Sequence, residues 1–144
     1  MNTPGVSAIA AGEHTFTLML ALSRKLVNAH NSMRDGYWLM DRKRQVGTQL
    51  HGKTLGISGL GRVGQIVAQR ALAFGMSVVA YDPYLSEEQV GDERIILVGL
   101  RDLLGRSDFV TIHVPATSET RKLLSADRIS QMKPGARLIN TSHG

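Results

Sequence analysis

Cysteine is absent from the 144 residues of this sequence. Its absence excludes disulfide bonds and a thiolate nucleophile, and it suits the cytoplasm, where we expect the protein to be found. No apolar run approaches the roughly 20 residues that would span a bilayer, so no membrane segment is predicted. The N-terminus has no basic stretch followed by an apolar one, and we predict no signal peptide. Internal repeats, metal-ligand spacings and serine-nucleophile motifs are also lacking, so we expect no metal site.

Basic residues outnumber acidic ones, giving a net charge of +5 and an isoelectric point near 10.0. Such a balance suits nucleic acid or an anionic ligand. The basic residues are scattered, however, and the one tight group is Arg42, Lys43 and Arg44. No nucleic-acid-binding motif accompanies this group. We therefore interpret it as a solvated loop and expect no nucleic-acid partner.

The chain forms one domain (1–144) with two unequal parts, an N-terminal segment (1–51) and a core (52–144). Residues 7–31 are apolar on most sides, which predicts one long and largely buried helix. A loop or arm follows it, up to Gly52. From residue 53 onward, short apolar runs alternate with amphipathic segments. The predicted strands are 55–58, 78–81, 95–98, 109–114 and 137–140, and the predicted helices are 62–74, 86–90, 100–104 and 127–132.

Apolar strands separated by helices predict a parallel sheet covered on both faces, which is a doubly wound α/β fold. In such a fold the ligand binds at the carboxyl ends of the strands. Those ends carry Gly59, Asp82, Pro115 and Thr141. We therefore expect all of these residues at one edge of the sheet.

The segment GLGRVG after the first predicted strand matches the pattern G-x-G-x-x-G. The pattern alone is weak, but here a strand precedes it and an amphipathic helix follows, as dinucleotide binding requires. Gly59 permits the tight turn, Gly61 lets a pyrophosphate approach the backbone, and Gly64 lets helix and strand pack closely. The free N–H groups around Arg62 and Val63 then favour the phosphate charge. The alternative is that the glycines serve only as turn residues.

Asp82 lies about 20 residues further on, at the end of the second predicted strand, where the fingerprint expects an acidic residue. Its carboxylate would accept hydrogen bonds from the hydroxyls of the adenosine ribose and would repel a 2′-phosphate. The sequence therefore predicts NAD rather than NADP as the cofactor. The alternative is a simple turn residue before Pro83.

Together with this fingerprint, several other motifs make the sequence resemble the D-isomer-specific 2-hydroxyacid dehydrogenase family, particularly its phosphoglycerate dehydrogenase-like members. The resemblance covers nearly the whole chain and implies a Rossmann-like NAD-binding domain. The motifs that carry it are Asn2-Thr3-Pro4-Gly5, Glu13-His14, residues 52–57 (GKTLGI), Phe74-Gly75-Met76, Tyr81-Asp82-Pro83, Asp108-Phe109-Val110, His113-Val114-Pro115, Glu119-Thr120 and residues 132–135 (MKPG).

The resemblance also implies roles for particular positions. Arg62 and Val63 would bind the pyrophosphate through their backbone, and Asp82 with Pro83 would face the adenosine. The other cofactor-lining positions would be Val114, Pro115, Thr120, Asn140, Thr141 and Ser142, the last three bordering the nicotinamide. Taken without the family, Val114 reads equally as a core residue and Thr120 as a helix cap.

Two departures from the family pattern affect the expected activity. The family places a substrate-gripping arginine two residues after Thr141, where this sequence has His143, which lacks the fork and permanent charge of arginine. The family's glutamate–histidine acid/base pair would lie beyond Gly144, and its substrate domain would lie largely before Met1. The resemblance therefore implies a chain truncated at both ends, without the substrate domain. We expect such a chain to bind the cofactor without full catalysis.

The remaining histidines do not replace the missing acid/base pair. We expect His113 at the edge of the sheet, His14 as a satisfied core residue, and His30 and His51 exposed. None of them has a glutamate placed to orient its ring. An imidazole without such a partner is a weak candidate for general acid/base catalysis.

Two functional hypotheses follow. The first is an oxidoreductase domain that serves hydride transfer between NAD and a 2-hydroxy or 2-keto acid. The alternative is a non-catalytic NAD-sensing module, such as the corepressors related to this family. The resemblance also implies a homodimer formed by the long helix and the arm, where Tyr37, Trp38 and Leu39 would need covering.

Overall fold

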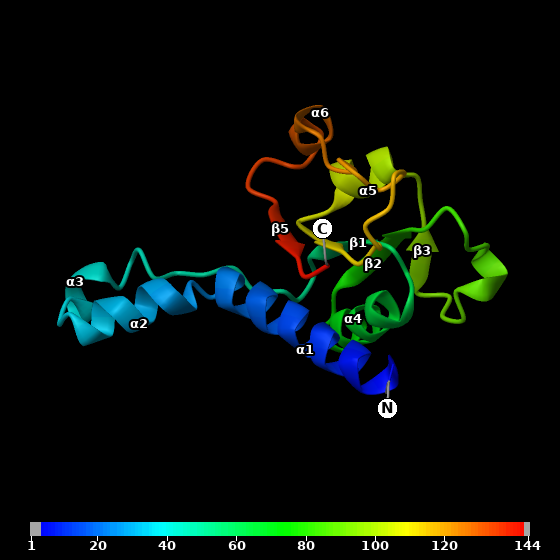
Figure 1. Cartoon of the computed structure of the whole chain (residues 1–144). Coiled ribbons are helices and arrows are strands. Elements are labelled where there is room, and N and C mark those ends of the chain that lie inside the picture. Colours follow the sequence, from blue (N-terminus) through cyan, green and yellow to red (C-terminus); the bar gives the residue numbers. More distant parts are fainter. Residues whose placement is uncertain (1–3, 143–144) are drawn as a thin grey trace.

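A single five-stranded parallel sheet lies at the centre of the computed structural model, which describes residues 4–142. The strand order is β3-β2-β1-β4-β5, with the first strand of the core at the middle (Figure 1). This confirms the predicted doubly wound α/β fold. The strands are β1 (Thr54–Ser58), β2 (Ser77–Tyr81), β3 (Ile95–Leu97), β4 (Phe109–Ile112) and β5 (Arg137–Asn140).

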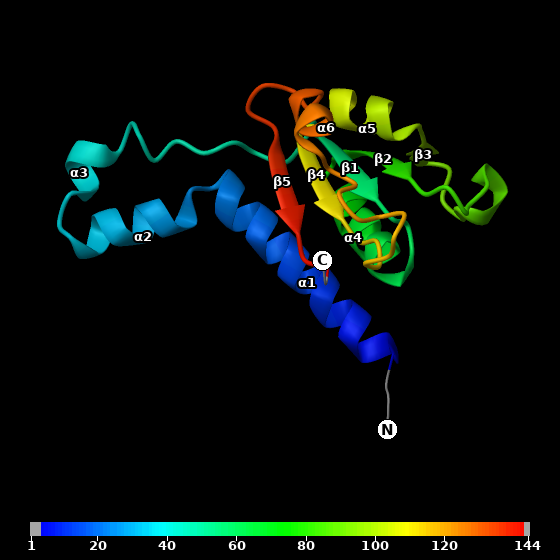
Figure 2. The ribbon, with the colours of Figure 1, turned by 45° about the horizontal axis from the view of Figure 1, so that its top comes forward.

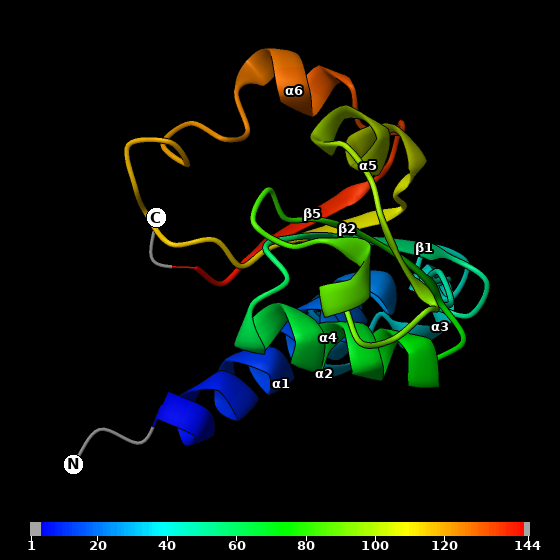
Figure 3. The ribbon, with the colours of Figure 1, turned by 90° about the vertical axis from the view of Figure 1, so that its right-hand side faces the viewer.

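Helices cover both faces of this sheet (Figure 3). The helices α1 (Pro4–Ser23) and α4 (Arg62–Ala73) lie on one face, and α5 (Leu100–Arg106) and α6 (Ala126–Ser130) lie on the other. A single turn of 3-10 helix, η1 (Glu87–Gln89), connects β2 to β3. Because both faces are covered, the strands carry apolar side chains in both directions, as their unbroken apolar runs predicted.

Two hydrophobic cores result from the alternation of side chains along each strand. On β2, Val78 and Ala80 pack toward α4, whereas Val79 packs with Leu103 and Leu104 of α5. The larger core also holds the fully buried ring of Phe109. It further includes Phe16, Met19, Leu55, Ile57, Val67, Ala71 and Ile139. The N-terminal helix therefore contributes to the same core as α4.

The end of α4 shows how the sequence sets an element boundary. Gly75 adopts a positive φ of 70°, which glycine tolerates without strain. Its N–H donates to the carbonyl of Leu72 at 3.0 Å, and the N–H of Met76 donates to that of Ala71 at 3.0 Å. These two bonds form a Schellman motif that ends the helix at the predicted glycine.

The N-terminal segment differs from its prediction as one long helix. It breaks at Lys25, whose φ is 52°, so that α1 is followed by a separate helix α2 (Leu26–Arg34). A short helix, α3 (Trp38–Asp41), forms within the predicted loop. The amide of Thr48 donates to the carbonyl of Ser23 at 2.7 Å, which holds the returning chain against the end of α1. No residue in the sequence signalled this break, since apolar residues continue past it at Leu26 and Val27.

The prediction that the N-terminal helix is largely buried was also wrong. His14 is exposed rather than part of the core, because α1 packs on α4 and β5 along one side only. The helices α2 and α3 project away from the sheet (Figures 1 and 2), and we call residues 26–46 the arm. The exposed large apolar side chains of the arm are Leu26, Val27, Met33, Tyr37, Leu39, Met40 and Val46. Among the described residues, no helix is long and apolar enough to cross a membrane.

Candidate functional site

The turn between β1 and α4 contains two positions where the structure requires glycine. Gly59 has a φ of +91°, and a Cβ atom on it would lie 2.8 Å from the carbonyl oxygen of His113. A Cβ on Gly64 would overlap the carbonyl oxygen of Gly59. These two glycines therefore serve the turn itself and the close packing of α4 against it.

Gly61 stands apart from the other two, because the structure does not require glycine there. Its φ is −70°, which suits any residue, and a Cβ on it would meet nothing within 4 Å. It is the N-cap of α4 and supplies no side chain to the free N–H groups of the first turn. An open backbone and free N–H groups at a helix start make a cradle for an anion.

Asp82, directly after β2, is tied to this turn. The amide of Leu60 donates to Asp82 Oδ2 at 3.0 Å, and the amide of Tyr84 donates to Asp82 Oδ1 at 3.0 Å. Leu60 is fully buried, so this carboxylate satisfies an amide that water does not reach. The sequence analysis named a ribose ligand at Asp82, with a turn residue as the alternative. The bond from Tyr84 is of the turn kind, whereas the bond from the Leu60 amide was not predicted. Each oxygen keeps a second lone pair for an incoming hydroxyl.

The loop after β4 forms the opposite wall. It starts where the amide of His113 donates to the carbonyl of Ser58 at 2.8 Å. Val114 is half-buried and lines the groove rather than the core. The hydroxyl of Thr120 accepts from the amide of Thr117 at 2.8 Å and also bonds the carbonyl of Pro115. Thr120 therefore stabilises the loop through backbone bonds, much as a capping residue would, which was its alternative interpretation.

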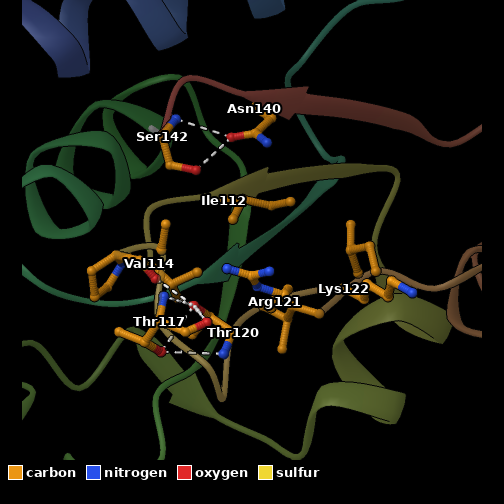
Figure 4. Close-up of a pocket in the computed structure, with 12 residues that line it drawn as sticks. Ile112, Val114, Thr117, Thr120, Arg121, Lys122, Asn140 and Ser142 are labelled. Atoms are coloured by element: carbon orange, nitrogen blue, oxygen red, sulfur yellow. Dashed lines mark hydrogen bonds between the residues drawn. The ribbon is translucent and has the colours of Figure 1, made fainter. Parts of the chain in front are cut away.

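Beyond that loop lies the end of β5. Asn140 Oδ1 accepts from both the amide and the hydroxyl of Ser142, at 2.9 and 2.7 Å. Figure 4 shows these two residues across a cavity of about 450 Å³ from Val114, Thr117 and Thr120. The turn after β5 is therefore internally bonded and faces the wall formed by the β4 loop.

A hydroxyl that the sequence did not single out fixes the next residue. Thr15 of α1 is fully buried, and its Oγ1 lies 2.8 Å from Oγ1 of Thr141 and 2.9 Å from the carbonyl oxygen of Ala11. Thr15 donates to Ala11, so Thr141 donates to Thr15. This bond anchors the end of β5 to α1. A threonine within an apolar helix was the only signal in the sequence.

Two larger cavities complete the groove along the carboxyl edge of the sheet. One of about 540 Å³ is lined by Gly59, Gly61, Asp82 and Pro83. The other, of about 650 Å³, is lined by α1 together with Arg62, Val63, Thr141 and Ser142. Val114 and Pro115 line all three cavities and join them. The structure therefore brings the predicted site residues to one edge, with Gly64 buried beneath the turn, whereas His143 lies outside the described residues.

His113 also lines this groove, although the sequence assigned it only to the edge of the sheet. Its Nε2 lies 2.9 Å from the hydroxyl of the buried Thr111. Burial lowers the pKa of His113 to about 4, because desolvation disfavours the charged ring. The ring is therefore neutral at pH 7 and adds no charge to the groove.

Comparison with known proteins identifies the family to which the chain belongs. Residues 16–144 match the family model described as "D-isomer specific 2-hydroxyacid dehydrogenase, NAD binding domain". The chain belongs to this dehydrogenase family. It is the NAD-binding domain of D-2-hydroxyacid dehydrogenases, as the sequence motifs predicted.

The chain matches only part of the length of its relatives in this family. It is 42% identical to D-3-phosphoglycerate dehydrogenase of Synechocystis sp. and 43% identical to hydroxypyruvate reductase of Thermotoga maritima, over the whole chain in both cases. It spans only 26% and 45% of those two proteins. D-lactate dehydrogenase from Aquifex aeolicus, solved with NAD and lactic acid, superposes with a TM-score of 0.89 at 36% identity, covering 97% of this chain and 41% of that one. None of these matches favours the alternative of a non-catalytic sensing module.

Proposed function

We propose that the groove binds one NAD molecule in an extended conformation. The pyrophosphate lies against the backbone from Gly61 to Val63, the adenosine ribose at Asp82, and the nicotinamide beside Thr141. The observation that carries this proposal is the open cradle at Gly61, since a glycine there has no structural necessity. An anion at the start of α4 is stabilised by the free N–H groups and by the helix dipole.

A direct binding measurement tests this proposal. Isothermal titration of the purified chain with NADH should give saturable heat with one site. At 100 times the dissociation constant, NADH should stabilise the fold by about 2.7 kcal/mol in thermal unfolding. NADPH, which carries a 2′-phosphate, should bind more weakly because Asp82 repels it. A well-folded sample that gives neither heat nor thermal protection with NADH would refute the proposal.

We further propose that this domain serves the oxidation or reduction of a small 2-hydroxy or 2-keto acid. NAD, when bound, carries the hydride. The role of this chain is to bind and orient NAD. His113, the one histidine lining the groove in residues 4–142, bonds Thr111 rather than a carboxylate and so has no partner suited to acid/base catalysis. His143 holds the family's arginine position and would hold the substrate carboxylate weakly. Assays with glyoxylate, hydroxypyruvate and NADH should show binding without full turnover by this chain.

The arm supports a further proposal, that two copies of the chain form a dimer through it. Leu39 and Met40 are 82% and 81% exposed, and an apolar surface of this kind is usually covered by a partner. Light scattering should therefore give the mass of a dimer, and Leu39→Asp with Met40→Asp should give a monomer. Ile129→Asp on α6, also exposed but outside the arm, should leave the dimer intact. A monomer at high concentration for the unaltered chain would contradict the proposal.

We also propose that the protein has no nucleic-acid or membrane partner and acts in the cytoplasm. Its basic group on the arm is exposed, and the carbonyl of Arg44 accepts from the Lys25 ammonium at 2.8 Å, as in an ordinary solvated loop. A cysteine-free composition suits a reducing compartment.

A further inference from the structure

The adenosine end of the groove is acidic, although the protein as a whole is basic. Among the described residues that line the 540 Å³ cavity, Asp82 and Glu119 are acidic and none is lysine or arginine. His113, which also lines it, is neutral at pH 7. The cavity thus carries two negative charges, although the chain as a whole carries +5. An added phosphate would meet two like charges and no cation there.

Glu119 is held at this cavity by Tyr84. The Tyr84 hydroxyl donates to Glu119 Oε2 at 2.6 Å, joining the loop after β2 to the loop after β4. Within the described part of the chain, it is the one direct hydrogen bond between residues 82–86 and residues 113–124. The same residue donates its amide to Asp82, so Tyr84 contacts both carboxylates. The bond to Glu119 and its charge also raise the pKa of Tyr84, which keeps the hydroxyl protonated.

We propose that Glu119, held by Tyr84, is a second determinant of cofactor choice and acts with Asp82 to exclude dinucleotides that carry a 2′-phosphate. The proposal rests on the binding of NAD along this groove. Asp82 alone would select the free 2′-hydroxyl by hydrogen bonding and repulsion. Glu119 adds repulsion from the opposite wall, without having to touch the ribose itself.

Glu119→Gln is the sharpest test, because its amide oxygen still accepts from Tyr84 while the charge is lost. Removing one of two like charges from the neighbourhood of a doubly charged phosphate should tighten NADPH binding roughly five- to tenfold at low ionic strength. NADH binding should change less than twofold. Glu93→Gln is the matched control, since Glu93 is an exposed glutamate that does not line the cavity. Competitive titration of NADPH against NADH gives the ratio of affinities for each variant.

Tyr84→Phe separates the position of Glu119 from its charge. It keeps both carboxylates and releases Glu119, so the preference for NADH should fall in the same direction by a smaller factor. An unchanged preference in Tyr84→Phe would overturn the role of Tyr84. An equal ratio in Glu119→Gln and Glu93→Gln, with NADH still bound, would overturn the role of Glu119. Absence of NADH binding by the unaltered chain would instead refute the proposed function.

Discussion

Replacing Gly61 with valine should weaken NADH binding strongly, at only a small cost to the stability of the fold. The Cβ would meet no protein atom within 4 Å, and a φ of −70° accommodates a valine. The side chain would instead occupy the space directly over the start of α4, where we propose that the pyrophosphate lies. We expect the affinity for NADH to fall on the order of 100-fold or more, which is about 2.7 kcal/mol. Calorimetric titration measures the loss, and thermal unfolding checks the fold.

Gly99 offers a matched control for this experiment. It is also a helix N-cap, at α5, with a φ of −65° and open space around its Cβ position. Gly99→Val therefore carries the same small cost of a valine at an N-cap. It should not affect NADH binding, because Gly99 does not line the groove. If Gly61→Val bound NADH as tightly as Gly99→Val does, the phosphates would have to lie elsewhere.

Asp82→Ala should lower both affinity and stability, which distinguishes it from the Gly61 variant. It removes the proposed ribose ligand and also the acceptor for the buried amide of Leu60. A buried amide without a partner costs about 1–3 kcal/mol of folding free energy. The affinity for NADH should fall by roughly 30- to 100-fold, since a charged acceptor and the shape of the turn are lost together.

Asp82→Asn provides the graded comparison, because its single amide oxygen can accept from one partner but not from both. Its stability should lie between those of the unaltered chain and Asp82→Ala. Thermal unfolding and titration with NADH are measured on the same samples. If Asp82→Ala kept the original affinity, the carboxylate would be a purely structural residue of the turn.

The sequence predicted the core of this fold well, because local signals there agree with tertiary packing. The last strand, residues 137–140, appears with the predicted bounds. The helix α4 ends at Ala73, one residue before its predicted end and two residues before Gly75 with its positive φ. The glycine fingerprint likewise lies at the predicted edge of the sheet. Apolar periodicity and turn residues are local properties, so a single sequence reveals them.

Contacts between distant residues were not predictable in the same way. Lysine rarely adopts the left-handed conformation that separates α1 from α2 at Lys25, so no residue type announced the break. His14 is exposed because it lies on the side of α1 that does not pack against α4 and β5. Thr15 and Glu119 acquire their roles from partners 126 and 35 residues away. Such pairings are set by the topology of the fold, and the apolar periodicity of the sequence does not reveal that topology.

The bond between Thr15 and Thr141 has a consequence for biosynthesis. The two residues are 126 positions apart, and a ribosome adding about 5–20 residues per second needs roughly 6 to 25 s to pass from one to the other. During that interval the side of α1 that will meet β5 has no strand to rest on. The helix α1 is thus fully docked only after β5 has been synthesised. The end of the groove where we propose that the nicotinamide lies forms only when both ends of this long loop have met.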